Sequence, residues 1–463
     1  MTPPSTEAST LLMPSQQLQP LVADLAEVGL HQSERISQPV DEPLLVGQDN
    51  SIGAIERMDV AIDVSDNPAA KVLNARVVAL FNQLFGPKPA IDASNVSLHH
   101  MSGSMTNRVY IMTIDPAPMV PRARAPYMLR AAAQNKHHEA IQMPRKYMFR
   151  IYGTGIEEIL SRENELFWVS QITSLGFGPQ MYGIFGNGRI EEFLESTTMT
   201  KDGMRDAMTS KNIAQRLCEL HTMVSHYCPH GSGNSGSKEA LYLNGKPELW
   251  TKVDEWMQLI LSKWSEIRRR CDSNAQCAEL LDNWHKVEHA VNTFKAHIER
   301  NVRSPLVFTH NDMLYGNILQ LKHTGNVEIV DFEYSGFNYR GFDIANHFCE
   351  WMYDYSSENS HLLDPEQYPT AEERYTFLRS YVCTMASLNA RIKADQDKQP
   401  SEDWINCKVA ELDREVASFV PASHLFWGVQ SFLKACYNEI DFDFVGRSTQ
   451  RVSIFLRQVA SME

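Results

Sequence analysis

The chain has 463 residues, of which 43% are hydrophobic and 22% are charged, and its formal net charge is −14. This composition is typical of a folded protein with a large core, and the length allows two or three domains. The acidic balance argues against nucleic acid as a partner. The chain also has no run of about 18 apolar residues, which argues against stable membrane insertion.

The 8 cysteines are scattered and have no zinc-site spacing, and the first residues lack the basic and apolar segments of a secretory signal. We therefore expect free thiols and a cytoplasmic protein.

The first 70 residues differ from the rest of the chain, because they hold few aromatic residues and many Ser, Gln, Pro, Asp and Glu. We expect an N-terminal arm, 1–70, that is largely disordered, with a short helix over 21–30. Apolar residues then recur with helical spacing, which predicts an amphipathic helix over 72–84.

Two predicted strands, 96–98 and 109–114, flank a turn of small residues that ends in Met105, Thr106 and Asn107. Such a turn can place backbone N–H groups against phosphates, in the way a glycine-rich loop does. Taken alone, the pattern is more often an ordinary hairpin.

A third predicted strand, 147–153, carries Arg150 inside an apolar run, and a helix is predicted over 163–175. An inward-facing Arg150 needs an anionic partner, for which Glu165 on that helix is the candidate. The alternative is an Arg that faces solvent.

A hairpin is predicted over 181–194, with Asn187-Gly188 at its turn. The chain after it is mostly helical, with apolar stripes over 249–267 and 281–298. A Gly/Ser-rich loop is expected over 230–237.

The strongest pattern is His310-x-Asp312 followed by Asn317, a short apolar strand and Asp331. Phosphoryl transfer needs a carboxylate that orients and deprotonates the attacking hydroxyl group, which Asp312 can provide. It also needs hard oxygen ligands that hold Mg²⁺ on the nucleotide phosphates, which Asn317 and Asp331 can provide.

The run from Asp331 to Trp351 resembles the signature of the choline/ethanolamine kinase family, and the resemblance extends from about residue 72 to the C-terminus. It implies an α+β, protein-kinase-like fold, with a small antiparallel-sheet lobe and a large, mostly helical lobe. The lobes would span 71–195 and 196–463. The implied reaction is ATP- and Mg²⁺-dependent phosphorylation of ethanolamine, choline or both, the first step towards phosphatidylethanolamine and phosphatidylcholine. The resemblance also allows a homodimer.

The same resemblance implies roles for individual residues. Asp312 matches the catalytic base, and Asn317 and Asp331 match the metal ligands. The positions that match the nucleotide site are Met105, Thr106, Asn107, Arg150, Glu165, Glu192 and Leu194.

The positions that match the amino alcohol pocket, besides Asp312, are Tyr334, Glu350, Tyr355, Trp427, Gln430 and Phe442. Aromatic faces hold a quaternary ammonium, and Glu350 would supply negative charge. Two positions depart from the family pattern, because Gln430 replaces a common Trp and Arg447 stands where choline-preferring members would have an aromatic residue. We therefore hypothesise that ethanolamine is used well, and choline less well or comparably.

Two other readings remain open. An aminoglycoside-type phosphotransferase would share the Asp312 and Asn317 positions but is not expected to carry the whole 331–351 run. A non-catalytic scaffold with a kinase fold would have no evident reason to keep Asp312, Asn317 and Asp331 together.

Overall fold

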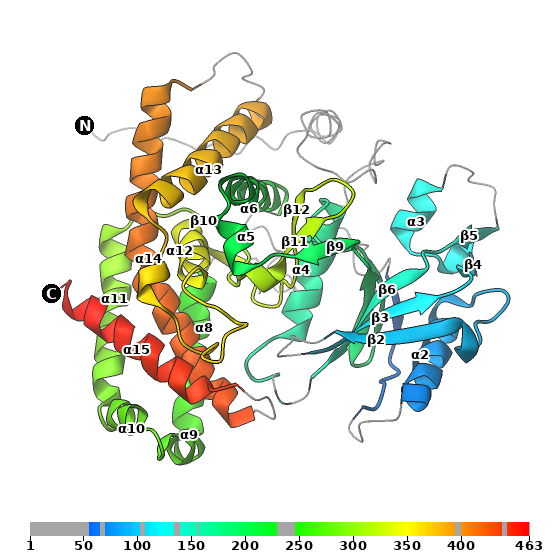
Figure 1. Ribbon diagram of the computed structural model, residues 1–463, viewed down its shortest axis with the longest axis horizontal. Helices are drawn as coiled ribbons and strands as arrows, with labels where there is room; N and C mark the ends of the chain where they lie inside the picture. Colours follow the sequence, from blue (N-terminus) through cyan, green and yellow to red (C-terminus); the bar gives the residue numbers. More distant parts are fainter. Residues whose placement is uncertain are drawn as a thin grey trace, which may run out of the picture.

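The computed structural model describes residues 55–64, 70–101, 107–133, 139–153, 155, 157–228, 246–393, 400–437 and 442–462. A β-sheet with flanking helices forms one side of the molecule, and a mostly helical part forms the other (Figure 1). This is the predicted α+β arrangement.

A six-stranded sheet forms the N-terminal part, with strand order β1-β7-β8-β6-β3-β2. Its neighbours are antiparallel, except for the parallel pair of β1 and β7. The strands are β1 (Glu56–Met58), β2 (Val96–Met101), β3 (Asn107–Ile114), β6 (Lys146–Tyr152), β7 (Met181–Phe185) and β8 (Gly188–Glu192). A small hairpin-like insertion carries β4 (Met119–Pro121), α3 (Tyr127–Ala132) and β5 (Ala140–Gln142).

Two helices accompany this sheet. Helix α2 (Ala70–Phe85) shares a core cluster with it, in which Phe81 packs against Tyr147 of β6. Helix α4 (Arg162–Ser174) lies between the sheet and the helical part (Figure 1). The Trp168 ring of α4 contacts Phe308 and Phe337 of the helical part, so α4 joins the two halves through one core.

The C-terminal part is built around α14 (Glu402–Tyr437), against which α12 (Arg340–Glu350), α13 (Ala371–Ile392) and α15 (Phe444–Ala460) pack. Its other helices are α5 (Lys201–Arg205), α6 (Ala207–Tyr227), α8 (Glu248–Ser262), α9 (Trp264–Cys271), α10 (Ala275–Asp282) and α11 (Trp284–Asn301). Buried apolar side chains form its continuous core.

Two short sheets lie at the face of this helical part that meets the N-terminal part (Figure 1). One pairs β10 (Leu306–Thr309) with β13 (Gly336–Tyr339), and the other has the order β12-β11-β9. The strands of the second are β9 (Ser196–Thr198), β11 (Ile318–Leu321) and β12 (Val327–Ile329). These strands hold the loops that carry the His310 and Asp331 motifs.

Several sequence-based expectations need correction. Residues 56–58 form β1, so the sheet begins before residue 71, where the arm was predicted to end. The apolar stripe over 249–267 is divided between two helices, because α8 ends before Lys263. Cys271 and Cys277 form a disulfide instead of free thiols, since the turn between α9 and α10 brings their Cα atoms to 5.6 Å. The predicted helix over 21–30 and the loop over 230–237 lie outside the described residues.

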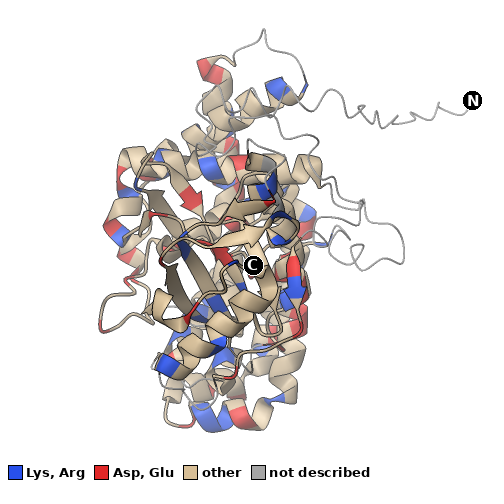
Figure 2. Ribbon diagram, turned by 90° about the vertical axis from the view of Figure 1, so that its right-hand side faces the viewer, with Lys and Arg blue, Asp and Glu red and all other residues tan. Residues whose placement is uncertain are grey.

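Within the described part of the chain, none of the helices is both long enough and apolar enough to span a bilayer. Acidic and basic residues are interspersed along the helices and strands drawn in Figure 2.

Candidate active site

Asp312 and Asn317 lie in the loop between β10 and β11 and hold each other in place. The Asn317 Nδ2 atom donates to the Asp312 backbone oxygen at 2.9 Å and to Asp312 Oδ2 at 3.2 Å. The amide oxygen of Asn317 is therefore left for another partner, such as a cation.

Asp343, on α12, fixes the backbone of this loop. Its carboxylate accepts hydrogen bonds from the backbone N–H groups of His310 and Asn311 at 2.8 and 2.7 Å, and His221 Nε2 lies 2.9 Å from it. Burial opposes the charge of Asp343, but the hydrogen bond and charge of His221 outweigh it and lower the pKa. Asn311 has a left-handed backbone conformation, with φ of 66°, so these bonds hold a turn that would otherwise be strained.

Asn346 connects the loop between β10 and β11, which we call the catalytic loop, to Trp427 on α14. Its Nδ2 donates to the Asn311 backbone oxygen at 3.1 Å, and its Oδ1 accepts from Trp427 Nε1 at 2.7 Å. Sequence reasoning missed the positioning roles of Asp343 and Asn346, although both lie inside the 331–351 run.

Asp331 follows β12, has φ of 71° and faces the sheet. Arg150 Nη1 lies 3.2 Å from Asp331 Oδ1, and Arg150 Nε lies 3.6 Å from Glu191 Oε2. Arg150 therefore points inward, as one of the two sequence-based alternatives requires.

Glu165 is not the partner of Arg150, contrary to our expectation. It binds Arg189 at 2.6 Å and Arg162 at 2.8 Å. The reason is the strand register, in which Arg189 of β8 lies directly opposite Arg150 of β6 and takes up the Glu165 carboxylate. Cross-strand pairing was not readable from the sequence, so Arg189 was missed. Arg162 was missed as well, although it stands three residues before Glu165 on the same helix.

Glu165, Asp331 and Glu333 form a cluster in which one carboxylate oxygen of each lies within 4.8 Å of the others. Burial opposes the charge of Glu165, but Arg189 and Arg162 outweigh it and lower its pKa to about 2. Burial and then Asp331 raise the pKa of Glu333 to about 7. A buried group of carboxylate oxygens suits a hard divalent cation, so the residues present fit Mg²⁺. Glu333 was missed, although it stands two positions after Asp331.

Asp312 lies in a strongly acidic environment. Burial is the largest cause that raises its pKa well above the usual range, and the charges of Glu350, Glu333 and Asp331 add to it. A carboxylate whose charge is disfavoured in this way is a stronger base, so Asp312 is suited to accept a proton.

The remaining positions predicted to bind nucleotide line the sheet side. Asn107 Oδ1 accepts from Arg162 Nη2 at 3.0 Å. Glu192 and Gln180 exchange two hydrogen bonds that hold the end of β8 to the segment before β7, and Leu194 is buried just beyond β8. Met105 and Thr106 lie outside the described residues.

The residues predicted to bind the amino alcohol come together beside Asn346. The ring centroids of Tyr334 and Trp427 are 5.0 Å apart, and Gln430 Nε2 donates to the Tyr334 hydroxyl at 2.7 Å. Arg447 brings Phe442 into the same cluster, because its guanidinium lies 5.8 Å from the Phe442 ring centroid and 5.9 Å from that of Trp427.

Glu350 contributes negative charge near Asp312, but its carboxylate is already bound within the protein. Arg451 Nη2 lies 3.0 Å from Glu350 Oε1, and the Tyr355 hydroxyl donates to Glu350 Oε2 at 2.6 Å. Both members of the ion pair are at most 1% exposed. The Arg451–Glu350 pair is therefore neutral before any substrate enters.

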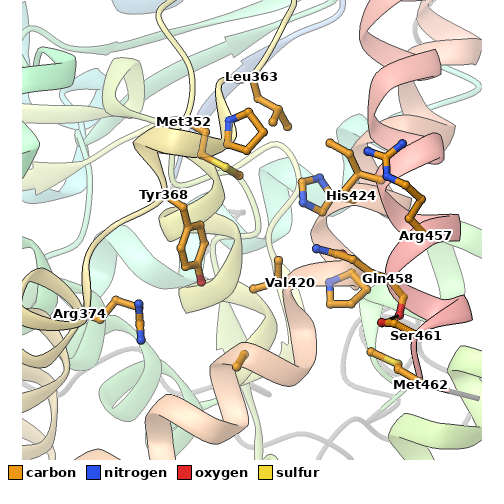
Figure 3. A pocket seen from close by; sticks show the side chains of 14 residues that line it. Met352, Leu363, Tyr368, Arg374, Val420, His424, Arg457, Gln458, Ser461 and Met462 are labelled. Carbon is orange, nitrogen blue, oxygen red and sulfur yellow. Dashed lines mark hydrogen bonds between the residues drawn. The ribbon is translucent and has the colours of Figure 1, made fainter.

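A separate cavity of about 690 Å³ lies between α14, α15 and the segment that leads into α13. Figure 3 shows Met352 and Tyr368 on one side of it, and His424 and Gln458 on the other. Asp312, Asp331 and the pocket residues are not among its lining residues, so it is distinct from the site described above.

Comparisons with known proteins agree with this geometry. The family model of choline/ethanolamine kinase matches residues 98–456. A probable choline kinase 2 of Arabidopsis thaliana is 34% identical over 307 residues, which are 66% of this chain and 76% of the plant protein. A choline/ethanolamine kinase of Homo sapiens is 30% identical over 320 residues, 68% of this chain and 73% of the human protein.

The fold is also that of a solved Plasmodium vivax ethanolamine kinase, with a TM-score of 0.58 and 22% identity over 84% of this chain and 91% of that one. The family model covers well over half of the chain, and it includes the catalytic loop, the acidic cluster and the pocket on α14. The chain therefore belongs to the choline/ethanolamine kinase family.

Proposed function

We propose that this protein transfers the γ-phosphoryl group of ATP to the hydroxyl group of ethanolamine and uses choline less well. Members of its family are phosphotransferases with an alcohol group as acceptor, and membership of a kinase family implies the use of ATP. The observation that carries the proposal is Asp312, a half-buried carboxylate that is held by Asn317 and lies in the acidic field of Glu350, Glu333 and Asp331.

Asp312 is the proposed catalytic base. Its raised pKa makes it able to accept the hydroxyl proton as the alcohol oxygen attacks phosphorus. The hydrogen bond from Asn317 holds the carboxylate in one orientation, so that the alcohol is positioned as well as deprotonated.

We propose that Asn317, Asp331 and Glu333 hold Mg²⁺. When bound, the cation would neutralise charge on the phosphate oxygens. Its positive charge would also offset the burial and the repulsion by Asp331 that together raise the pKa of Glu333.

The nucleotide would lie between the sheet and the catalytic loop. Arg150 is placed to contact phosphate oxygens, because it already reaches across to Asp331 at 3.2 Å. Next to it, the Glu165 carboxylate compensates the positive charges of Arg189 and Arg162. Asn107, Glu192 and Leu194 stay candidates for nucleotide contacts, as do Met105 and Thr106.

The preference for ethanolamine rests on the pocket around Tyr334. A primary ammonium is a hydrogen-bond donor, whereas a quaternary ammonium is not. The Gln430 amide donates through its nitrogen to Tyr334, and this bond leaves its oxygen able to accept from another donor. Such an acceptor favours the primary amine.

We also propose that the enzyme is cytoplasmic, that it can form a homodimer, and that its two lobes meet near residue 195. Size-exclusion chromatography with light scattering distinguishes a dimer of about 105 kDa from a monomer of 52.7 kDa.

The test measures ADP release with ethanolamine, choline and a panel of aminoglycosides, for the wild type and Asp312→Asn. We expect turnover with ethanolamine, loss of that turnover in Asp312→Asn, and no turnover with aminoglycosides. Asp272→Asn is the matched control, because this Asp is 68% exposed and, among the described residues, forms one long ion pair, with Arg268 at 3.9 Å.

Turnover with aminoglycosides instead of amino alcohols would favour the rival phosphotransferase. A folded wild type without turnover on any acceptor would favour the scaffold. Full activity in a folded Asp312→Asn protein would show that Asp312 is not the base.

A further inference from the structure

The guanidinium group of Arg447, on α15, lies inside a cage of aromatic rings. Its Cζ atom is 4.8 Å from the ring centroid of Tyr353, 5.8 Å from that of Phe442, and 5.9 Å from those of Tyr355 and Trp427. Aromatic rings at these distances attract a cation through their electron-rich faces. Several rings around one point form the kind of site that binds quaternary ammonium ligands. Here the chain's own side chain occupies that point.

Arg447 has little other compensation for its charge. It is 5% exposed, and its one hydrogen bond within the described residues is a long one, 3.5 Å, from Nη2 to the Tyr355 hydroxyl. Its Nε is buried and has no hydrogen-bond partner there. The rings therefore supply most of the stabilisation of this buried cation.

The nearby carboxylate is already engaged by a different cation. Glu350 is bound by Arg451 at 3.0 Å and by the Tyr355 hydroxyl. Burial disfavours the charge of Arg447, but Tyr355, Tyr353 and Glu350 favour it more strongly, and the pKa stays above its usual value. Arg447 is thus a permanent positive charge in the cage, in addition to the neutral Arg451–Glu350 pair.

We propose that Arg447 takes the place of a substrate's quaternary ammonium group in this cage, so that the acceptor site rejects choline-type alcohols and accepts an alcohol with a primary amine. This rests on the proposed function and deepens it, because it assigns the selectivity to one residue. A trimethylammonium group cannot donate hydrogen bonds and depends on aromatic faces, which Arg447 already covers.

Charge repulsion adds to this competition. A second fixed cation about 5 Å from Arg447 in a buried site weakens binding by roughly a hundredfold. A primary ammonium can instead lie outside the cage, where the Gln430 amide oxygen and the acidic field around Asp312 and Glu333 stabilise it.

The first test compares kcat/KM for choline and ethanolamine in the wild type, Arg447→Tyr and Arg447→Lys. We expect the wild type to prefer ethanolamine by about a hundredfold. Arg447→Tyr removes the resident cation and supplies another ring, so the choline-to-ethanolamine ratio should increase by about thirtyfold, mainly through a lower KM for choline. Arg447→Lys keeps the charge and should keep most of the discrimination.

A wild type that uses choline as well as ethanolamine would overturn the proposal. An unchanged ratio in a folded Arg447→Tyr protein, or the same large gain in Arg447→Lys, would also overturn it.

The second test does not depend on turnover. Tetramethylammonium is titrated into the wild type and Arg447→Tyr while tryptophan fluorescence, to which Trp427 contributes, is recorded. We expect no saturable binding to the wild type below about 10 mM, and binding at least about tenfold tighter to Arg447→Tyr. Saturable binding to the wild type at submillimolar concentration would overturn the proposal even if the variant did not fold.

If neither amino alcohol is phosphorylated, the proposed function fails. The titration then still decides whether Arg447 blocks the cage.

Discussion

Arg150 and Arg189 on the sheet side of the active site and Arg447 on the helical side are buried cations that are stabilised by different kinds of contact. On the sheet side, Arg150 and Arg189 each face carboxylates, at distances from 2.5 to 3.6 Å. On the helical side, Arg447 faces aromatic rings and has one long hydrogen bond. Both environments keep a positive charge in the interior. Arg150 and Arg189, like Arg451 beside Glu350, do so in ion pairs, whereas Arg447 has no ion pair within the described residues.

The difference explains what each side can bind. Ion pairs on the sheet side can exchange partners, so phosphate oxygens and Mg²⁺ can enter while the total charge stays balanced. Arg447 already lies among the rings of the aromatic cage, so it competes directly with a cationic ligand there. We therefore propose that the sheet side binds the nucleotide and that the aromatic cage selects the amino alcohol.

The largest expected effect tests the carboxylate that lies between the two sides. Asp312→Asn keeps the shape of the side chain but removes the base, so kcat should fall by about 10³- to 10⁴-fold, with a smaller change in KM. Steady-state kinetics measure this, and an equal thermal midpoint for the variant would show that the fold is kept. A loss below about tenfold would contradict the assignment of the base.

Breaking the ion pairs on the sheet side should mainly reduce stability. Arg189→Met leaves Glu165 and Glu191 without this partner in the interior, so we expect a cost of about 3–5 kcal/mol in the free energy of unfolding. Urea denaturation measures it. The matched control is Arg145→Met, whose pair with Asp115 is 63% and 70% exposed and contributes less than about 1 kcal/mol. Equal costs for both variants would refute the contrast.

Acid should weaken the support beneath the catalytic loop through Asp343. Burial alone would raise the folded-state pKa of Asp343, but His221 and the hydrogen bonds from backbone N–H groups outweigh burial and lower it. Its contribution to stability is therefore complete above the unfolded-state pKa and is lost as the pH falls through the lower folded-state pKa. We expect Asp343→Asn to be less stable near neutral pH, and to lose less further stability than the wild type between about pH 5 and pH 3. Thermal midpoints across this range measure it, and parallel profiles would contradict the assignment.

The smallest effect concerns the hydrogen bond between Gln430 and Tyr334. Gln430→Met keeps the volume but removes the bond to Tyr334 and, with it, the amide oxygen proposed to accept from the ammonium group. A hydrogen bond of this kind contributes about 1 kcal/mol, so the KM for ethanolamine should rise about fivefold with little change in kcat. Gln320→Met is the control, because Gln320 lies on β11 with an exposed side chain that makes a 3.4 Å bond to the Gly325 backbone oxygen. A larger effect on kcat than on KM would mean that Gln430 acts on the chemical step.

Motifs with tight spacing were predictable, because local chain geometry places their residues. The loop brings Asp312 and Asn317 into contact, and a short strand leads to Asp331, as the spacing predicts. Their roles in catalysis and metal binding stay predictions. Partners that come from cross-strand register were not predictable. Arg189 stands opposite Arg150 only once β8 pairs with β6, and this pairing sends Glu165 to a different Arg.

The sequence by itself determined the family and the α+β architecture, since continuous runs of residues carry the motifs for both. It also led to the proposal that the loop of Asp312 and Asn317 is catalytic. Only the tertiary structure decided which charges compensate each other. Arg447 could be noted in the sequence as an unusual residue, but only the packing of α15 against α14 and the segment after α12 places it among four rings. Electrostatic and cation–π interactions depend on distances through space, and residues far apart in the chain set those distances.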